Sequence, residues 1–264
     1  MLTLTNITKT FAKGTVNEKT ALAGIDLHLE KGDFVTVLGS NGAGKSTLFG
    51  AIAGTFRPDT GSVVLDGQDI TNQPDFKRSK YIGRLFQDPL KGTAPNMTIE
   101  ENLALAYMRA SSHTSPFSMI SKADRSGFRE RLSQLELGLE DRMDHPVGLL
   151  SGGQRQALTL LMATLVTPKL LLLDEHTAAL DPGTAEKVLG LTEKIVRENG
   201  ITCLMITHNV GSALQLGNRT IMMKDGKIRL ELSGEERACM TTDQLLKAFH
   251  KQGLDNDRIL FSGE

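Results

Sequence analysis

Apolar and polar residues alternate near the start of the chain, as expected of strands that bury one face. The alternation covers residues 2–8 and 21–29, and we expect these segments to pair as an antiparallel β subdomain. A continuous apolar run over 34–38 is typical of a strand buried on both faces. Two shorter strands are expected over 62–66 and 81–86.

From about residue 88 the apolar positions recur with the period of helices. Helices are expected over 98–108, where a capping-box sequence marks the start, and over 122–137. The segment 111–116 between them has the composition of a loop. The pattern predicts a helical subdomain over about 88–166, inserted into an α/β body.

The body resumes after residue 150 with a helix expected over 151–166 and an apolar strand over 170–174. Another helix should open at Pro182, with Asp181 as its N-cap, because proline suits the first helical position. Further strands are expected over 202–207, 219–223 and 227–231, and an amphipathic helix over 241–251.

Composition fits a single large domain. The chain has 264 residues, 39% of them apolar, so we expect one α/β domain over 1–231 and a short helical tail over 232–264. Lys and Arg number 30 against 31 Asp and Glu, and this balance argues against nucleic acid as a partner. Cys203 lies in an apolar run and is expected to be a buried strand thiol.

Hydropathy gives no sign of a membrane segment. The most apolar stretches fall short of the roughly 20 residues that cross a bilayer. The first residues alternate like a strand and lack the charged and apolar regions of a signal peptide. We therefore expect a soluble, cytoplasmic protein that serves a membrane only by docking on another chain.

A glycine-rich loop follows the strand at 34–38 and matches the phosphate-binding pattern G-x-x-x-x-G-K-[ST]. Its glycines let backbone N–H groups turn inward around phosphate oxygens, and a helix N-terminus adds a favourable dipole. Lys45 supplies a charge for the β- and γ-phosphates, and the Ser46 hydroxyl can ligate Mg²⁺. The motif predicts nucleoside triphosphate binding. Its residues are Gly39, Ser40, Asn41, Gly42, Ala43, Gly44, Lys45, Ser46 and Thr47.

A second candidate motif is the apolar strand that ends in Asp174 and Glu175. Open α/β sheets bind ligands at the C-terminal ends of their strands, where these carboxylates fall. Asp174 can hold Mg²⁺, directly or through water, and Glu175 can accept a proton from an attacking water. Two solvated acids after a strand are common, and the phosphate loop in the same chain is what favours the functional interpretation.

A third motif, Leu-Ser-Gly-Gly-Gln at 150–154, opens the expected helix at 151–166. A serine and two glycines at a helix N-terminus form an anion-binding element, although an ordinary N-cap would have the same sequence. The candidate ligand-binding residues are Ser151, Gly152, Gly153 and Gln154.

With these three motifs together, the chain resembles the ATP-binding cassette (ABC) ATPases, in which L-S-G-G-Q is the diagnostic signature. The resemblance extends from about Leu2 to Glu231. It implies an α/β phosphate-loop ABC ATPase fold with an inserted helical subdomain and an antiparallel β subdomain. It also implies ATP and Mg²⁺ as cofactors, ATP hydrolysis as the reaction, and catalytic roles for Lys45 and Glu175.

The resemblance assigns further roles. Gln87 matches the glutamine that reaches the Mg²⁺ and the catalytic water and contacts the transmembrane partner. His208 matches the switch histidine that contacts the γ-phosphate, and Asp181 lies in the segment that communicates across the dimer. Phe11 stands where an aromatic residue, most often tyrosine, stacks on adenine. The chain departs from the family at His176, where members commonly carry proline, and a structural role is favoured for it over proton transfer.

Family resemblance also implies partners. ATP bound at 39–47 of one subunit would be covered by Ser151, Gly152 and Gly153 of a second, most simply the same chain, in a head-to-tail dimer. The dimer would drive separate permease subunits, so the chain would be peripheral on the inner face of the cell membrane. We expect a transporter ATPase, with a soluble non-transport ABC protein, an exporter ATPase or a small-molecule or nucleotide kinase as alternatives.

Direction and cargo follow only from analogy. The sequence over 174–182, read with 206–209, looks like a bacterial subgroup of importers whose binding proteins take amino acids, aromatic ones included. A substrate-binding protein would then act through the permease.

Overall fold

The structure of the chain is a computed structural model that describes residues 1–110 and 120–251. The predicted loop at 111–116 and the end of the predicted tail, 252–264, lie outside the described residues. The chain forms two compact units. The first unit is Met1–Arg78 with Gly200–Glu264, and the second unit is Ser79–Asn199.

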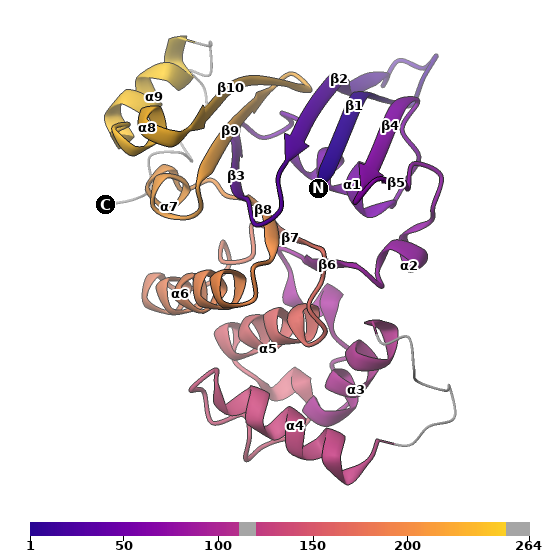
Figure 1. The fold of residues 1–264 in the computed structure, drawn as a ribbon, viewed down its shortest axis with the longest axis vertical. Coiled ribbons are helices and arrows are strands. Elements are labelled where there is room, and N and C mark those ends of the chain that lie inside the picture. The colour runs from indigo at the N-terminus through magenta and orange to yellow at the C-terminus, as the bar shows by residue number, and fades with distance from the viewer. Residues whose placement is uncertain (111–119, 252–264) are drawn as a thin grey trace. The chain divides into compact units, whose positions relative to one another are not determined.

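An antiparallel sheet with the strand order β2-β1-β4-β5 belongs to the first unit (Figure 1). Leu2, Leu4 and Ile7 of β1 are buried, and Leu2 lies opposite Leu29 of β2 and Leu65 of β4. The two strands expected at the start of the chain and their pairing are thereby confirmed. The strands are β1 (Leu2–Phe11), β2 (Lys19–Leu29), β4 (Thr60–Leu65) and β5 (Gln68–Asp69).

A second group of strands in the first unit includes β3, which directly precedes the phosphate-loop sequence. β3 pairs in parallel with β8 and with β9, and β10 returns antiparallel beside β9. Every residue of β3 is buried, as the continuous apolar run predicts. The strands are β3 (Phe34–Gly39), β8 (Thr202–Ile206), β9 (Arg219–Lys224) and β10 (Lys227–Ser233).

Helices cover these strands through an apolar cluster that includes Leu38 of β3, Met222 of β9 and Leu245 of α9. Leu245 is fully buried, which confirms the predicted amphipathic helix near the end of the chain. The short helices α7 and α8 were not predicted. The helices described in this unit are α1 (Lys45–Ala53), α2 (Asp75–Arg78), α7 (Val210–Gln215), α8 (Gly234–Ala238) and α9 (Thr242–Lys251).

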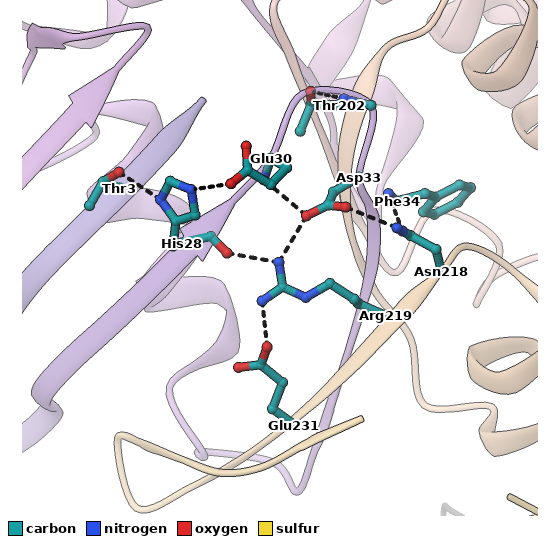
Figure 2. A network of polar contacts seen from close by, with 10 residues as sticks. Thr3, His28, Glu30, Asp33, Phe34, Thr202, Asn218, Arg219 and Glu231 are labelled. Atoms are coloured by element: carbon teal, nitrogen blue, oxygen red, sulfur yellow. Dashed lines mark hydrogen bonds and ion pairs between the residues drawn. The ribbon is translucent and has the colours of Figure 1, made fainter. Parts of the chain in front are cut away.

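A polar network fastens the start of β3 to neighbouring strands (Figure 2). Asp33 accepts hydrogen bonds from the Asn218 amide (2.9 Å), the Arg219 guanidinium (2.8 Å) and the Glu30 N–H (2.9 Å). Burial by itself raises the pKa of Asp33, but these hydrogen bonds outweigh burial and hold the pKa below its ordinary value. Because Arg219 also bonds Glu231, one arginine joins the entry of β3 to β9 and β10.

In the second unit, β6 (Ile82–Leu85) and β7 (Leu170–Asp174) are parallel. Leu85 lies opposite Leu173, so both strands end at the same edge. The four leucines of β7 are fully buried, as their run in the sequence predicts.

Helices α3, α4 and α5 of the second unit lie together (Figure 1), and their buried side chains form one apolar core. Leu103 of α3, Phe128 and Leu132 of α4, and Leu158 of α5 all contribute to it. The helices described here are α3 (Ile99–Ala110), α4 (Lys122–Ser133), α5 (Gly152–Thr164) and α6 (Pro182–Glu198). Two 3₁₀ turns, η1 (Pro89–Gly92) and η2 (Val147–Leu149), precede α3 and α5.

Helix α4 is shorter than predicted, since it ends at Ser133 and not at residue 137. Glu136 (φ +55°) and Gly138 (φ +66°) adopt left-handed conformations, which a continuing helix does not contain. Leu135 is nevertheless buried in the same core. The apolar pattern therefore reported burial correctly and helix length incorrectly.

Predicted helix starts are confirmed. The Thr98 N–H donates to the Glu101 carboxylate (2.7 Å) and the Glu101 N–H to the Thr98 hydroxyl (3.2 Å), which completes the capping box. Asp181 caps α6 by accepting from the Thr184 N–H at 3.0 Å. None of the helices within residues 1–110 and 120–251 has the length and apolar character needed to cross a lipid bilayer.

Candidate functional site

The phosphate-loop sequence connects β3 to α1 in the first unit, which is the context its motif requires. Gly42 and Gly44 have φ of +81° and +102°, conformations that glycine adopts without a steric penalty. A Cβ on Gly44 would overlap the carbonyl oxygen of Ala21 in β2. The glycines are thus required by backbone conformation and by close approach.

Lys45 is 5% exposed and is folded across the loop. Its ammonium donates to the carbonyl oxygens of Gly39 (2.7 Å) and Ser40 (3.1 Å). A charge held there lies inside the curve of the backbone, where phosphate oxygens are expected. Ser46 follows at the start of α1 and is exposed.

The turn between β9 and β10 supports the loop from behind, a contact that was not predicted. The Gly226 N–H donates to the Ala43 carbonyl (3.0 Å), and the Gly226 carbonyl accepts from the Ala23 N–H (2.9 Å). Asp225-Gly226 is a hairpin-turn dipeptide, so the turn itself was readable, but its contact with a loop far away in sequence was not.

His208 lies at the same edge of the first unit as the loop. Val37 of β3 is opposite Ile206 of β8, and the Thr207 N–H donates to the Val37 carbonyl at 3.2 Å. Gly39 lies two residues after Val37, and His208 lies two residues after Ile206. Because Val37 and Ile206 are paired across parallel strands, both residues follow the same level of the sheet. The structure brings these two predicted site residues into adjacent segments.

Phe11 ends β1 and is 42% exposed. Its ring packs edge-to-face on Phe56, with centroids 5.5 Å apart. Across the strands it pairs with Lys19, whose Nζ lies 3.2 Å from where a Cβ on Gly42 would be. An exposed aromatic ring is thus placed near the phosphate loop, and Lys19 is an additional cation there that the sequence reasoning missed.

The second unit holds the carboxylate motif and the glutamine at the shared edge of β6 and β7. Asp174 ends β7, and its Oδ2 lies 3.9 Å from the Arg84 guanidinium of β6. Arg84 also stacks on Phe86, 4.6 Å from the ring centroid, and Gln87 follows directly. Glu175 has φ of +47°, a left-handed conformation that is uncommon for a residue with a Cβ.

His176 turns into the core directly after Glu175. It is 2% exposed, and its Nε2 lies 3.1 Å from the Thr192 hydroxyl of α6. Burial lowers the pKa of His176 to about 4, so the ring is neutral near pH 7 and is not poised to exchange protons there. These contacts support the structural role expected from the sequence.

The signature segment, residues 150–154, contains the start of α5, and Ser151 is the N-cap of this helix. The Ser151 hydroxyl accepts from the Gln154 N–H (3.2 Å), and the Gln154 side chain accepts from the Ser151 N–H (3.2 Å). Arg155 holds the preceding turn by donating to the Leu150 carbonyl at 2.9 Å. Ser151 and Gly152 remain exposed at the end of the helix.

Gly153 is buried against α6. A Cβ there would overlap the Thr184 methyl group, and a Cβ on Gly152 would lie 3.3 Å from Leu180. Asp181 caps α6 in the same turn, and hydrogen bonds from the Thr184 side chain and N–H lower its pKa. The signature glycines and Asp181 are therefore brought together, and Thr184 is the contact residue that the sequence reasoning missed.

Comparison with known proteins identifies the class. The pattern of the ABC transporter family matches residues 22–178. The tyrosine transport ATP-binding protein of Clostridioides difficile is 42% identical over 94% of this chain and 98% of its own length. The methionine import ATP-binding protein of Sodalis glossinidius is 32% identical over 97% of this chain and 72% of its own.

Solved structures agree with this result. A dimeric ATP-binding cassette in a post-hydrolysis state, bound to ADP and phosphate, aligns with a TM-score of 0.77 and 32% identity, covering 88% of this chain and 98% of that one. The predicted ABC ATPase fold, with mixed α/β structure and an antiparallel β subdomain, is confirmed. The chain belongs to the ABC transporter family and is an ATP-binding subunit that hydrolyses ATP.

Proposed function

We propose that this chain powers the import of an amino acid, with aromatic amino acids as the first candidates, through separate permease subunits. The observation that supports this most strongly is its 42% identity to a tyrosine transport ATP-binding protein across almost the full length of both chains. The similarity to a methionine import protein points to the same class of cargo.

The proposed roles in ATP binding and hydrolysis are assigned residue by residue. The loop N–H groups and Lys45 would hold the phosphates, Phe11 would stack on adenine, and His208 would contact the γ-phosphate. Glu175 would accept the proton of the attacking water. The backbone conformations of the loop and the edge positions of His208 and Glu175 support these roles.

Mg²⁺ would be held by oxygen ligands from Ser46, Gln87 and Asp174 together with the nucleotide. Within residues 1–110 and 120–251, no group of three His, Cys, Asp or Glu side chains could hold a metal alone. A hydroxyl, an amide and one carboxylate suit Mg²⁺, which keeps waters and binds through few protein groups and substrate phosphates. When bound, the ion would neutralise charge on the phosphates.

The working form would be a head-to-tail dimer of this chain. ATP on the loop of one copy would be covered by Ser151, Gly152, Gly153 and Gln154 of the other, with Asp181 beside them. A related cassette is dimeric in its ADP- and phosphate-bound state. The exposed position of Ser151 and Gly152 at the start of α5 suits a contact with a second chain.

The domain proposal is one ABC ATPase domain over 1–231, with the helical insertion over about 88–166 and a tail over 232–264. The permease would dock on the insertion, near Gln87 and residues 88–107, and hold the chain at the inner face of the membrane. Leu90 of η1 and Leu105 of α3 support this proposal, because they are 43% and 49% exposed and apolar. A substrate-binding protein would reach this chain only through the permease.

Docking is tested with Leu90→Asp and Lys91→Glu, assayed by permease pull-down and permease-stimulated ATPase activity. Glu193→Lys, an exposed change on α6, is the matched control. We expect the first two variants to lose stimulation while nucleotide binding is unchanged. Full binding and stimulation would place the docking surface elsewhere.

Cargo is tested by assembling the chain with its permease and binding protein in vesicles and measuring ATPase activity with candidate amino acids. We expect tyrosine or another aromatic amino acid to stimulate hydrolysis when the binding protein is present. Stimulation by an unrelated solute would contradict the cargo proposal, and activity independent of any binding protein would favour an exporter.

A further inference from the structure

The hydrogen bond between His176 and Thr192 has a fixed direction. Thr192 is fully buried, and its hydroxyl donates to the Val188 carbonyl at 2.8 Å. Because a threonine hydroxyl has a single proton, it can only accept from His176 at 3.1 Å. The Nε2 of His176 therefore carries the proton, and the imidazole is held in one tautomer and one orientation.

Glu175, the residue before His176, has an unusual backbone conformation. Glu175 has φ of +47°, and its carbonyl accepts from the Ala178 N–H at 3.0 Å in the turn that follows. A non-glycine residue persists in a left-handed conformation only when its surroundings enforce it. A proline at position 176 would restrict the backbone of Glu175 directly, whereas histidine imposes no such restriction. Contacts made by neighbouring residues can then help to hold this conformation.

Helix α6 holds His176, the residue after Glu175, through Thr192. The same helix is capped by Asp181 at its start and packs Thr184 against Gly153 of the signature segment. Thr192 lies two turns further along, so a single rigid helix supports the signature glycine at one point and the residue after Glu175 at another.

We propose that His176 is a positioning residue for hydrolysis, and that its hydrogen bond to Thr192 holds the Glu175 backbone so that the carboxylate faces the attacking water. The proposal rests on the assignment of Glu175 as the base. His176 itself exchanges no proton and touches no reacting atom. Loss of the bond lets Glu175 sample other conformations and slows hydrolysis without weakening nucleotide binding.

The test compares Thr192→Val, which removes the accepting hydroxyl at similar volume, with Thr192→Ser, which keeps it. Steady-state ATPase activity is measured for the full chain, alone and with its permease, and nucleotide affinity is measured separately with ADP. We expect Thr192→Val to lower kcat about tenfold with KM and ADP affinity unchanged, and Thr192→Ser to retain wild-type kcat. His176→Leu and His176→Gln form a second pair, since glutamine keeps an N–H donor.

A thermal melt of each variant separates positioning from stability. If Thr192→Val or His176→Leu melts at a lower temperature but keeps wild-type kcat below its melting range, the hydrogen bond is only structural and the proposal is wrong. A variant that fails to fold leaves the other pair to decide. Glu175→Gln is run in parallel, because normal hydrolysis by that variant would overturn the assignment of the base and not the role of the hydrogen bond.

Discussion

Gly153 offers a test of how the signature segment is positioned. It lies in α5, where alanine would ordinarily stabilise a helix by about 1 kcal/mol over glycine. Here the added Cβ would overlap the Thr184 methyl group of α6. Forcing an extra carbon into a packed contact costs about 1–3 kcal/mol, so α5 and α6 must separate locally. The overlap cost less the helix-propensity gain predicts a net destabilisation of up to about 2 kcal/mol.

For a domain of this size each kcal/mol lowers the melting temperature by about 2–4 °C, so the expected fall is up to about 8 °C. The larger effect is expected on activity, because displacement of a reacting arrangement by about 1 Å can cost on the order of 100-fold in rate. We expect Gly153→Ala to lower ATPase activity by about 10- to 100-fold. Nucleotide binding to the phosphate loop should be unchanged, since the substitution is in the other unit.

The matched double variant adds Thr184→Ser, which removes the overlapping methyl group and keeps the N–H that Asp181 caps. Melting temperature and ATPase activity are measured for both single variants and the double variant. We expect the double variant to recover most of both quantities, while Gly190→Ala, where a Cβ meets open space, should be fully active and slightly more stable. Normal behaviour of Gly153→Ala, or no recovery with Thr184→Ser, would refute the reasoning.

Two further predictions concern the first unit. Lys45→Ala removes the cation held inside the loop and should abolish tight MgATP binding and turnover in a nucleotide-binding and ATPase assay; near-normal hydrolysis would show that the loop is not the site. The lowered pKa of Asp33 means that its stabilising contribution is complete above its unfolded pKa of about 4 and is lost as pH falls through the lower folded value. Urea unfolding from pH 3 to 7 should therefore show Asp33→Asn to be about 1–3 kcal/mol less stable at pH 7 and to converge with wild type in acid; a constant difference would contradict this account.

Local chemistry explains which parts of the site could be predicted from the sequence. The phosphate loop requires glycines where φ is positive, and the cap of α6 requires Asp181 before Pro182. Each of these features is determined by residues that are neighbours in the sequence. The four leucines of β7 indicate a strand buried on both faces with equal clarity. Such features depend little on the rest of the fold.

Contacts between distant segments explain the rest. Gly226 supports the phosphate loop from a turn more than a hundred residues away, and Thr184 limits the space at Gly153 from another helix. His176 looked unremarkable in the sequence because its partner, Thr192, lies three turns into α6. The early end of α4 is set by the left-handed backbone at Glu136, which apolar periodicity does not report.

Glu175→Gln tests the central claim most directly, because it removes the proposed base and leaves the contacts that bind ATP. The measurement follows single-turnover hydrolysis, ATP affinity and molecular mass in solution for wild type and variant with MgATP. We predict wild-type affinity, hydrolysis reduced at least 100-fold, and accumulation of an ATP-bound dimer. Hydrolysis at the wild-type rate, or a variant that stays monomeric in ATP with and without its permease, would contradict the proposed mechanism.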